Sequence, residues 1–194
     1  MNEEFGPDLI ERLKTGDERA FDVVYEAYRH RLFAYLIRLT RNRDVAEDLL
    51  EETWLRFVDR LETIRDGAKL GPWLFAVARN LFLTHVRSLG SDIGGAGEWD
   101  EPADQAASPF DAVAASELAA RVERGLAAMP VSYREALLLV GVHGMTPSEA
   151  AAVCDLTPDA MRQRLLRARK MLAWWLGARD DAKTNEGRHG ERRA

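Results

Sequence analysis

The chain has 194 residues, of which 46% are hydrophobic and 30% are charged, and its formal net charge is −5 at pH 7. These values are typical of an ordinary globular protein with one domain or two small ones, and they exclude a disordered chain and a protein that coats nucleic acid non-specifically. A single cysteine, Cys154, excludes an internal disulfide and indicates a reducing compartment, and no apolar run approaches the ~20 residues that span a bilayer. The acidic N-terminus is unlike a signal peptide, so we expect a cytoplasmic protein with no membrane insertion.

The first half of the chain predicts a domain of about four helices, residues 8–88. Apolar residues at helical spacing indicate a short helix at 8–14 and a longer one whose apolar side runs from Phe21 to Leu39. A capping box led by Asp44 opens a third helix that reaches about Thr63, and Pro72 begins a fourth after a polar loop. Four helices of this length hold a core sufficient for independent folding.

The face of the third helix that lies opposite its apolar stripe is charged, but it carries an apolar residue, Leu55. An apolar anchor ringed by charges is typical of a protein-docking surface, although singly exposed leucines are also common. The candidate docking residues are Asp48, Glu51, Glu52, Leu55 and Arg56.

The composition changes between residues 89 and 115, which contain six acidic residues and no Lys or Arg. Gly, Ala, Ser and Pro are frequent there, so no helix is expected until the end of the segment. It predicts an acidic flexible linker between two domains. The charged residues 177–194 are nearly free of apolar groups and predict a mobile tail.

Residues 116–176 predict a second domain of four helices. Pro130 ends the first helix, and Ser132 caps a second that ends at His143–Gly144. The last two helices of the domain follow within residues 146–175.

Two helix starts separated by a three-residue break occupy this last segment. Thr146-Pro-Ser-Glu149 is a capping box that starts a short helix, and Thr157-Pro-Asp159 starts the next one. The break, residues 154–156, lacks the usual glycine, so Asp155 is the residue best able to adopt a left-handed conformation. Two capped helices at this spacing, the second long and basic, indicate a helix-turn-helix whose second helix enters the DNA major groove.

The second of these helices divides into an apolar stripe and a basic face. The stripe recurs at helical spacing and predicts the side that faces the core: Met161, Leu165, Ala168, Leu172 and Trp175. Residues off that stripe are the DNA-binding candidates, those near the N-terminal end for base edges and those farther along for phosphates: Asp159, Arg162, Gln163, Arg164, Arg167 and Lys170. For such a helix considered alone, the alternative to DNA binding is a solvated surface helix with several arginines.

The chain resembles the extracytoplasmic-function (ECF) group of bacterial sigma factors from Asp8 to Leu176. The resemblance is carried by AFDVVYEAY, AEDLLEETWLRF and WLFAVARN in the first half, and by MPVSYREALLL and SEAAAVCDLTPDAMRQRLLRARKML in the second. The order of these segments is more specific than any one of them. The resemblance implies an all-α fold of two small helical domains, the second a four-helix domain with a helix-turn-helix.

A sigma factor of this group directs core RNA polymerase to specific promoters and aids melting of the −10 element, without catalysing a reaction and without a cofactor. The implied partners are core RNA polymerase, promoter DNA and an anti-sigma factor, and we expect a monomer outside such complexes. The docking face would bind the polymerase clamp, although the family often has Gln at the position of Glu51. The acidic linker would thread toward the polymerase active site or serve as a simple tether. The implied −10 residues are Arg65, Asp66, Lys69, Asn80 and Arg87, and the second domain would read the −35 element.

An ordinary helix-turn-helix transcription regulator is the main alternative, with residues 1–88 as a sensing or dimerising domain. That regulator would bind a palindromic operator as a dimer, whereas a sigma factor acts on core polymerase as a monomer. A sigma-factor mimic that sequesters an anti-sigma factor would support no transcription. An enzyme or a metal protein is disfavoured, because the sequence has no recognisable catalytic triad or phosphate loop and its four histidines offer no partner to the acidic residues of 47–52.

Overall fold

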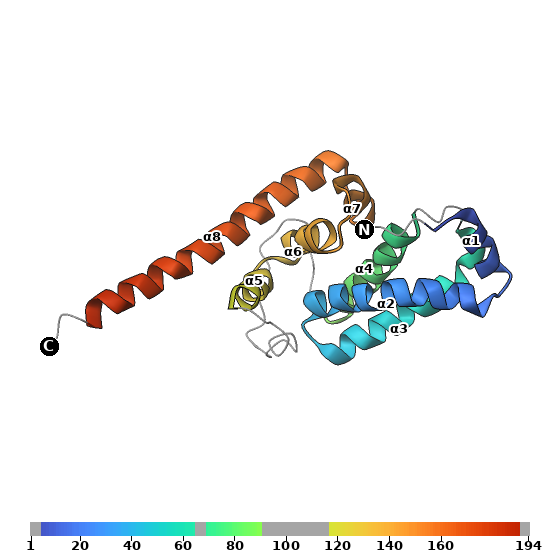
Figure 1. Ribbon diagram of the computed structural model, residues 1–194, viewed down its shortest axis with the longest axis horizontal. Helices are drawn as coiled ribbons and strands as arrows, with labels where there is room; N and C mark the ends of the chain where they lie inside the picture. The colour runs from blue at the N-terminus through green and yellow to red at the C-terminus, as the bar shows by residue number, and fades with distance from the viewer. Residues whose placement is uncertain (1–4, 65–68, 91–116, 191–194) are drawn as a thin grey trace.

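All regular structure is helical in the residues that the computed structural model describes, 5–64, 69–90 and 117–190 (Figure 1). The first half contains α1 (Pro7–Lys14), α2 (Glu18–Thr40), α3 (Arg43–Asp59), a 3-10 turn (Leu61–Thr63) and α4 (Leu70–Ser88). The second half contains α5 (Glu117–Ala127), α6 (Val131–Leu137), a π-helical turn (Leu138–Val142), α7 (Pro147–Val153) and α8 (Pro158–Gly190). The predicted all-α fold is confirmed.

The core of the first half forms where α2, α3 and α4 pack on one another (Figure 1). Phe57 of α3 is fully buried, and its ring contacts the rings of Phe21, Trp54 and Trp73 at centroid distances of 6.1, 5.8 and 6.2 Å. Large aromatic side chains contribute most of the burial energy in a core of this size. This cluster therefore fixes α3 against α4 and leaves the charged side of α3 facing outward.

The start of α3 differs from the prediction. The side-chain oxygen of Asn42 accepts a hydrogen bond from the Val45 backbone N–H at 3.2 Å, so Asn42 is the N-cap and α3 begins at Arg43. The prediction that Asp44 leads the helix was wrong, because the extended conformation that capping needs belongs to Asn42, at φ −133°. Asp44 lies in the first turn, where its charge suits the positive end of the helix dipole.

The start of α6 also differs. The carbonyl of Pro130 accepts hydrogen bonds from the N–H groups of Tyr133 and Arg134, so Pro130 is the N-cap and no side chain caps this helix. The prediction that Ser132 caps it was wrong because the helix starts at Val131, before that serine. Proline suits this position, since it fixes φ and needs no donor.

The helix-turn-helix forms as predicted. Thr146 and Glu149 make the reciprocal capping box, with the Glu149 N–H donating to Thr146 Oγ1 at 3.2 Å and the Thr146 N–H donating to Glu149 Oε2 at 2.7 Å. Asp155 adopts the left-handed conformation, at φ 55°, and the Ala160 N–H donates to Thr157 Oγ1 at 3.2 Å. Local hydrogen bonds thus start α7 and α8 where the sequence indicates.

The apolar stripe of α8 faces the core of the second half. Met161, Leu165 and Ala168 are buried where α8 packs on α6 and α7, and Leu172 and Trp175 are half-buried. α8 continues to Gly190, beyond Leu176 where the predicted domain ends. Residues 177–190 contain no proline, and their high charge does not end the helix.

The two halves pack against each other. α4 contacts α7, and α2 contacts α6, so the helix-turn-helix rests on the first half of the chain (Figure 1). No local pattern in the sequence indicates this contact.

Candidate functional site

The N-terminal part of α8 presents polar side chains to solvent. Five of the six predicted DNA-binding residues are exposed: Asp159, Arg162, Gln163, Arg167 and Lys170. The guanidinium of Arg162 pairs with the carboxylate of Asp159 one turn earlier, and both side chains remain mostly exposed. An exposed pair of this kind contributes little to stability, so its groups are available to another partner.

Arg164 differs from the other five residues. It is half-buried, and its charge lowers the pKa of Glu135 on α6, a buried carboxyl whose pKa is raised overall by its burial. The side chain of Arg164 therefore acts toward the protein interior as well as toward solvent.

The charged side of α3 is exposed as predicted. Asp48, Glu51, Leu55 and Arg56 are exposed and Glu52 is half-buried. Leu55 is 55% exposed, and Val58, one turn farther along the helix, is 50% exposed. Glu52 and Arg56 form an ion pair of 2.8 Å beside them. The two apolar side chains form a small hydrophobic patch among charges. Leu55 is expected there from the sequence, and Val58 is not.

The predicted −10 residues do not gather at one place. Arg65 and Asp66 lie outside the described residues. Lys69, Asn80 and Arg87 are exposed and lie before, in the middle of and near the end of α4. A helix rises about 1.5 Å per residue, so Lys69 and Arg87 are about 27 Å apart along it. Lys69 and Arg87 therefore cannot contact one nucleotide together.

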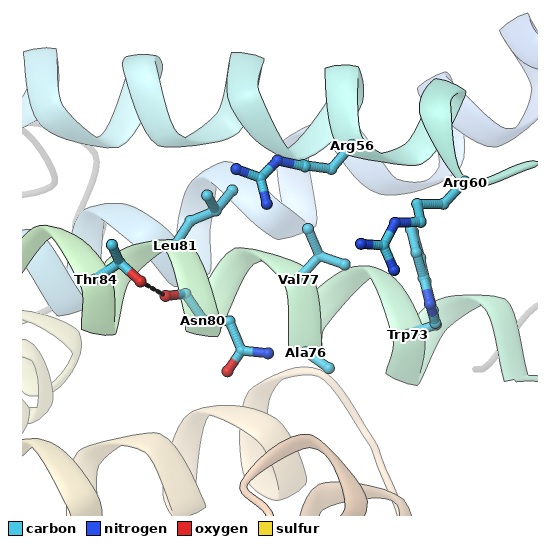
Figure 2. A pocket seen from close by; sticks show the side chains of 8 residues that line it. All are labelled: Arg56, Arg60, Trp73, Ala76, Val77, Asn80, Leu81 and Thr84. Atoms are coloured by element: carbon cyan, nitrogen blue, oxygen red, sulfur yellow. Dashed lines mark hydrogen bonds between the residues drawn. The ribbon is translucent and has the colours of Figure 1, made fainter.

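A pocket of about 330 Å³ lies between α3 and α4. Figure 2 shows Arg56 and Arg60 reaching from the α3 side toward Trp73, Val77 and Asn80 of α4. Its full lining is Arg56, Arg60, Trp73, Ala76, Val77, Asn80, Leu81 and Thr84. The pocket joins Arg56, predicted for docking, to Asn80, predicted for the −10 element.

From the sequence alone, Trp73 is interpreted as a packing residue, and nothing distinguishes Arg60. A signal was present, because Trp73, Val77, Asn80 and Thr84 recur at steps of four, three and four and so share one face of α4. The spacing does not reveal that the guanidinium groups of Arg56 on α3 and of Arg60, just after α3, lie over this face.

A buried polar cluster is shared between the first half and the second half. Glu135 of α6 is 2% exposed, and its Oε1 atom accepts hydrogen bonds from Arg79 Nε of α4 at 2.9 Å and from the Tyr35 hydroxyl of α2 at 3.3 Å. Burial raises the pKa of the Glu135 carboxyl, and Arg79 opposes that shift. Burial also raises the pKa of Tyr35, and Glu135 adds to this effect, so the phenol stays protonated and acts as a donor.

His143 lies beside this cluster. Its ring packs against the rings of Phe75 and Tyr35 of the first half, at centroid distances of 4.7 and 5.9 Å. Burial lowers the pKa of His143 to about 3, with further contributions from Arg31 and Arg38, so the imidazole is neutral. Its Nε2 atom is buried and has no hydrogen-bond partner among the described residues.

Family comparisons match both halves of the chain. The family model for sigma-70 region 2 matches residues 24–91, and the model for sigma-70, region 4 matches residues 119–172. The ECF RNA polymerase sigma factor EcfG of Rhodopseudomonas palustris is 32% identical over 148 residues, which cover 73% of this chain and 77% of EcfG. The ECF RNA polymerase sigma factor SigM of Bacillus subtilis is 30% identical over 153 residues, 78% of this chain and 91% of SigM.

Solved structures of sigma factors share the fold. The sigma factor RpoE of Bartonella quintana, in complex with the anti-sigma factor NepR, matches with a TM-score of 0.63 and 25% identity over 81% of this chain and 96% of that one. CnrH, in complex with the cytosolic domain of CnrY, matches with a TM-score of 0.66 and 22% identity over 89% of this chain and 97% of that one. The matched families fall on the two helical halves in the order that the sequence segments indicate. The chain belongs to the ECF family of RNA polymerase sigma factors.

Proposed function

We propose that this sigma factor acts through three surfaces, one for core RNA polymerase and two for promoter DNA. The hydrophobic patch and charges of α3 dock on the polymerase, with Asp48, Glu51, Glu52, Leu55 and Arg56 as contacts. The exposed face of α8 reads the −35 element. The exposed N-terminal part of α8, carried by a capped helix-turn-helix, is the observation on which the DNA-reading role depends.

The roles of the α8 residues follow from their distance to the N-terminal end. Asp159, Arg162 and Gln163 lie in the first two turns, which enter a major groove deepest, and so contact base edges. Arg167 and Lys170 lie farther along and contact phosphates. Arg164 is a flanking contact, because part of its charge is directed toward Glu135.

The pocket between α3 and α4 accepts a base of the −10 element. Extracting a base from a duplex costs a few kcal/mol, and stacking on an aromatic ring returns about 1–3 kcal/mol. Trp73 provides a ring, Asn80 provides an amide that can pair with a base edge, and Arg56 and Arg60 provide positive charge for the phosphate. Arg65, Asp66 and Lys69 precede this face and Arg87 follows it, so they contact the strand on either side.

Residues 8–88 bind the polymerase and the −10 element, and residues 116–176 bind the −35 element. Residues 89–115 form the acidic linker, and 177–194 are a charged tail. In this role the chain works in the cytoplasm, carries out no reaction of its own and needs no cofactor. None of the described helices has the length and apolar character needed to cross a membrane. The complex of the Bartonella relative with an anti-sigma factor supports an anti-sigma partner for this chain as well.

Transcription by core RNA polymerase tests the proposal. A genomic library is transcribed with and without the purified chain, and the new transcript starts are mapped. Transcripts that require the chain and share upstream −10 and −35 elements are expected. If the chain instead gives no transcripts and binds duplex palindromes as a dimer, the proposed function is refuted.

Two substitutions on α8 separate base reading from phosphate contact. Arg162→Ala should reduce discrimination at one −35 base pair by about 1–3 kcal/mol, because a bidentate contact to a base edge is lost. Lys170→Ala should reduce transcription from all promoters by a similar factor. The measurement is transcription from matched promoters and from promoters with single changes in the −35 element. Equal losses for Arg162→Ala on both kinds of promoter would show that Arg162 does not read a base.

A further inference from the structure

The exposed cations of α8 are not all held in the same way. Between Pro158 and Leu176, Arg162 is the only exposed cation that forms an ion pair with a described residue, the carboxylate of Asp159. The other exposed cations lie farther along the helix and have no carboxylate partner among the described residues: Arg167, Arg169 and Lys170. A long cation without a fixed partner suits the phosphate backbone, whereas a base edge requires donors in one orientation. Arg162 is therefore the cation of this face best prepared to read a base.

The Asp159 carboxylate is not used to cap the helix. The Thr157 hydroxyl oxygen accepts from the Ala160 N–H at 3.2 Å, while the side chain of Asp159 is 87% exposed and contacts Arg162. A favourable interaction with the helix dipole explains an acid in the first turn, but it does not require contact with an arginine. Phosphates repel an unpaired carboxylate, and pairing with Arg162 leaves a unit with no net charge.

The pairing leaves part of the Arg162 guanidinium free for a base. Asp159 occupies the Nη2 atom through its Oδ1 atom. An arginine has five N–H donors, so a parallel pair on Nη1 and Nη2 remains available. Guanine is the only base with two acceptors, O6 and N7, on its major-groove edge, whereas adenine places an amino group beside N7. The held guanidinium therefore matches guanine and opposes adenine.

The second carboxylate oxygen of Asp159 is available to the neighbouring base pair, because only Oδ1 has a partner among the described residues. Three helical residues rise about 4.5 Å and successive base pairs about 3.4 Å, so Asp159 and Arg162 can face adjacent pairs. A carboxylate only accepts hydrogen bonds. Cytosine offers it the N4 amino group, whereas guanine and thymine present acceptors and adenine presents N7 beside its amino group.

We propose that Asp159 is a positioning residue that holds Arg162 for a guanine of the −35 element and also selects a cytosine at the adjacent base pair. The pair has this role only if the chain reads promoters as proposed above. On an exposed surface the ion pair is weak, but its attraction strengthens when the groove excludes water and the local dielectric falls. One pair of side chains then determines two neighbouring bases.

A promoter library with a randomised −35 element tests this role. Core polymerase and the full chain transcribe the library, and sequencing of the transcripts, each barcoded for its promoter, gives the base preference at each position. The wild-type chain should prefer guanine at one position by about 5- to 150-fold, which corresponds to about 1–3 kcal/mol for a bidentate contact, and cytosine at the next. Arg162→Ala should abolish the guanine preference.

Substitutions of Asp159 separate positioning from a general effect of charge. Asp159→Ala should reduce the guanine preference by about three- to tenfold and abolish the cytosine preference. Asp159→Glu keeps a carboxylate three residues before Arg162 and should restore most of the guanine preference. Asp159→Ala added to Arg162→Ala should cause no further loss at the guanine position, because Asp159 acts there through the arginine.

The matched control is Asp8→Ala. It removes an exposed aspartate that also follows a proline at the start of a helix, α1, and it should leave both base preferences unchanged.

Either of two results overturns the positioning role. In the first, Asp159→Ala changes transcription of all library members by one common factor, so that Asp159 acts only as a charge near DNA. In the second, the wild-type chain shows no guanine preference at the position that Arg162→Ala affects. Both results leave the proposed function intact, since promoter-specific transcripts still appear. A wild-type chain that gives no promoter-specific transcripts would instead refute the proposed function.

Discussion

Leu55→Asp should weaken binding of the chain to core RNA polymerase by about 30- to 1,000-fold, or about 2–4 kcal/mol. Leu55 is 55% exposed on α3 and forms a hydrophobic patch with Val58, surrounded by Asp48, Glu51 and Arg56. In a docked complex the patch is desolvated. A carboxylate placed there must lose its hydration without gaining a partner, which is costly.

The measurement is a titration of fluorescently labelled chain with core polymerase. Because Leu55 is exposed, the substitution should leave the free energy of unfolding within about 0.5 kcal/mol of the parent. Val23→Asp, at a valine on α2 that is 50% exposed, is the matched control and should bind normally. If Leu55→Asp binds within twofold of the parent, α3 does not dock through this patch.

Arg134→Ala should lower the free energy of unfolding of the second half by about 3–5 kcal/mol. Arg134 is 4% exposed and donates from Nε to the Leu126 carbonyl at 2.8 Å and from Nη2 to the carbonyls of Ala127 and Met129 at 2.8 and 2.9 Å. These carbonyls lie at and just beyond the end of α5, where intrahelical donors run out. The Leu126 carbonyl also accepts from the Met129 N–H at 3.2 Å, so the carbonyls of Ala127 and Met129 are the ones that depend on Arg134. Each buried carbonyl that loses its donor costs about 1–3 kcal/mol.

Urea unfolding followed by circular dichroism measures this loss. Arg134→Lys should be intermediate, since an ammonium group lacks the planar fork that reaches several carbonyls at once. Arg124→Ala, at an exposed arginine of α5, should change the stability by less than about 0.5 kcal/mol. A loss below about 1 kcal/mol for Arg134→Ala would mean that water or other donors replace the guanidinium.

The helix-turn-helix could be predicted in detail because its chemistry is local. Thr146 and Glu149 are three residues apart, and the groups that they cap lie within the same turn. The left-handed Asp155 follows from the length of the break and the absence of glycine. The start of α3 was harder, because Asn42 and Asp44 are both good caps and the choice between them depends on how the chain leaves α2.

Contacts between distant segments could not be predicted. Tyr35 and Glu135 are 100 residues apart, and each would be interpreted from its neighbours as part of an ordinary helix. The pocket could not be predicted for the same reason. The spacing of Trp73 and Asn80 shows that they share one face of a helix, but it does not show that the guanidinium groups of Arg56 and Arg60, at the end of another helix, lie against that face. Periodicity shows which side of a helix is polar and does not show what lies opposite.

The left-handed Asp155 also restrains the connection between α7 and α8. A glycine at this position would give the connection between α7 and α8 many accessible conformations, whereas an aspartate has few, so the two helices are held at one fixed angle. α7 is the helix that packs on α4. We therefore expect α7 and α8 to move as one rigid body, so that the proposed DNA-binding face of α8 keeps a fixed orientation relative to α7.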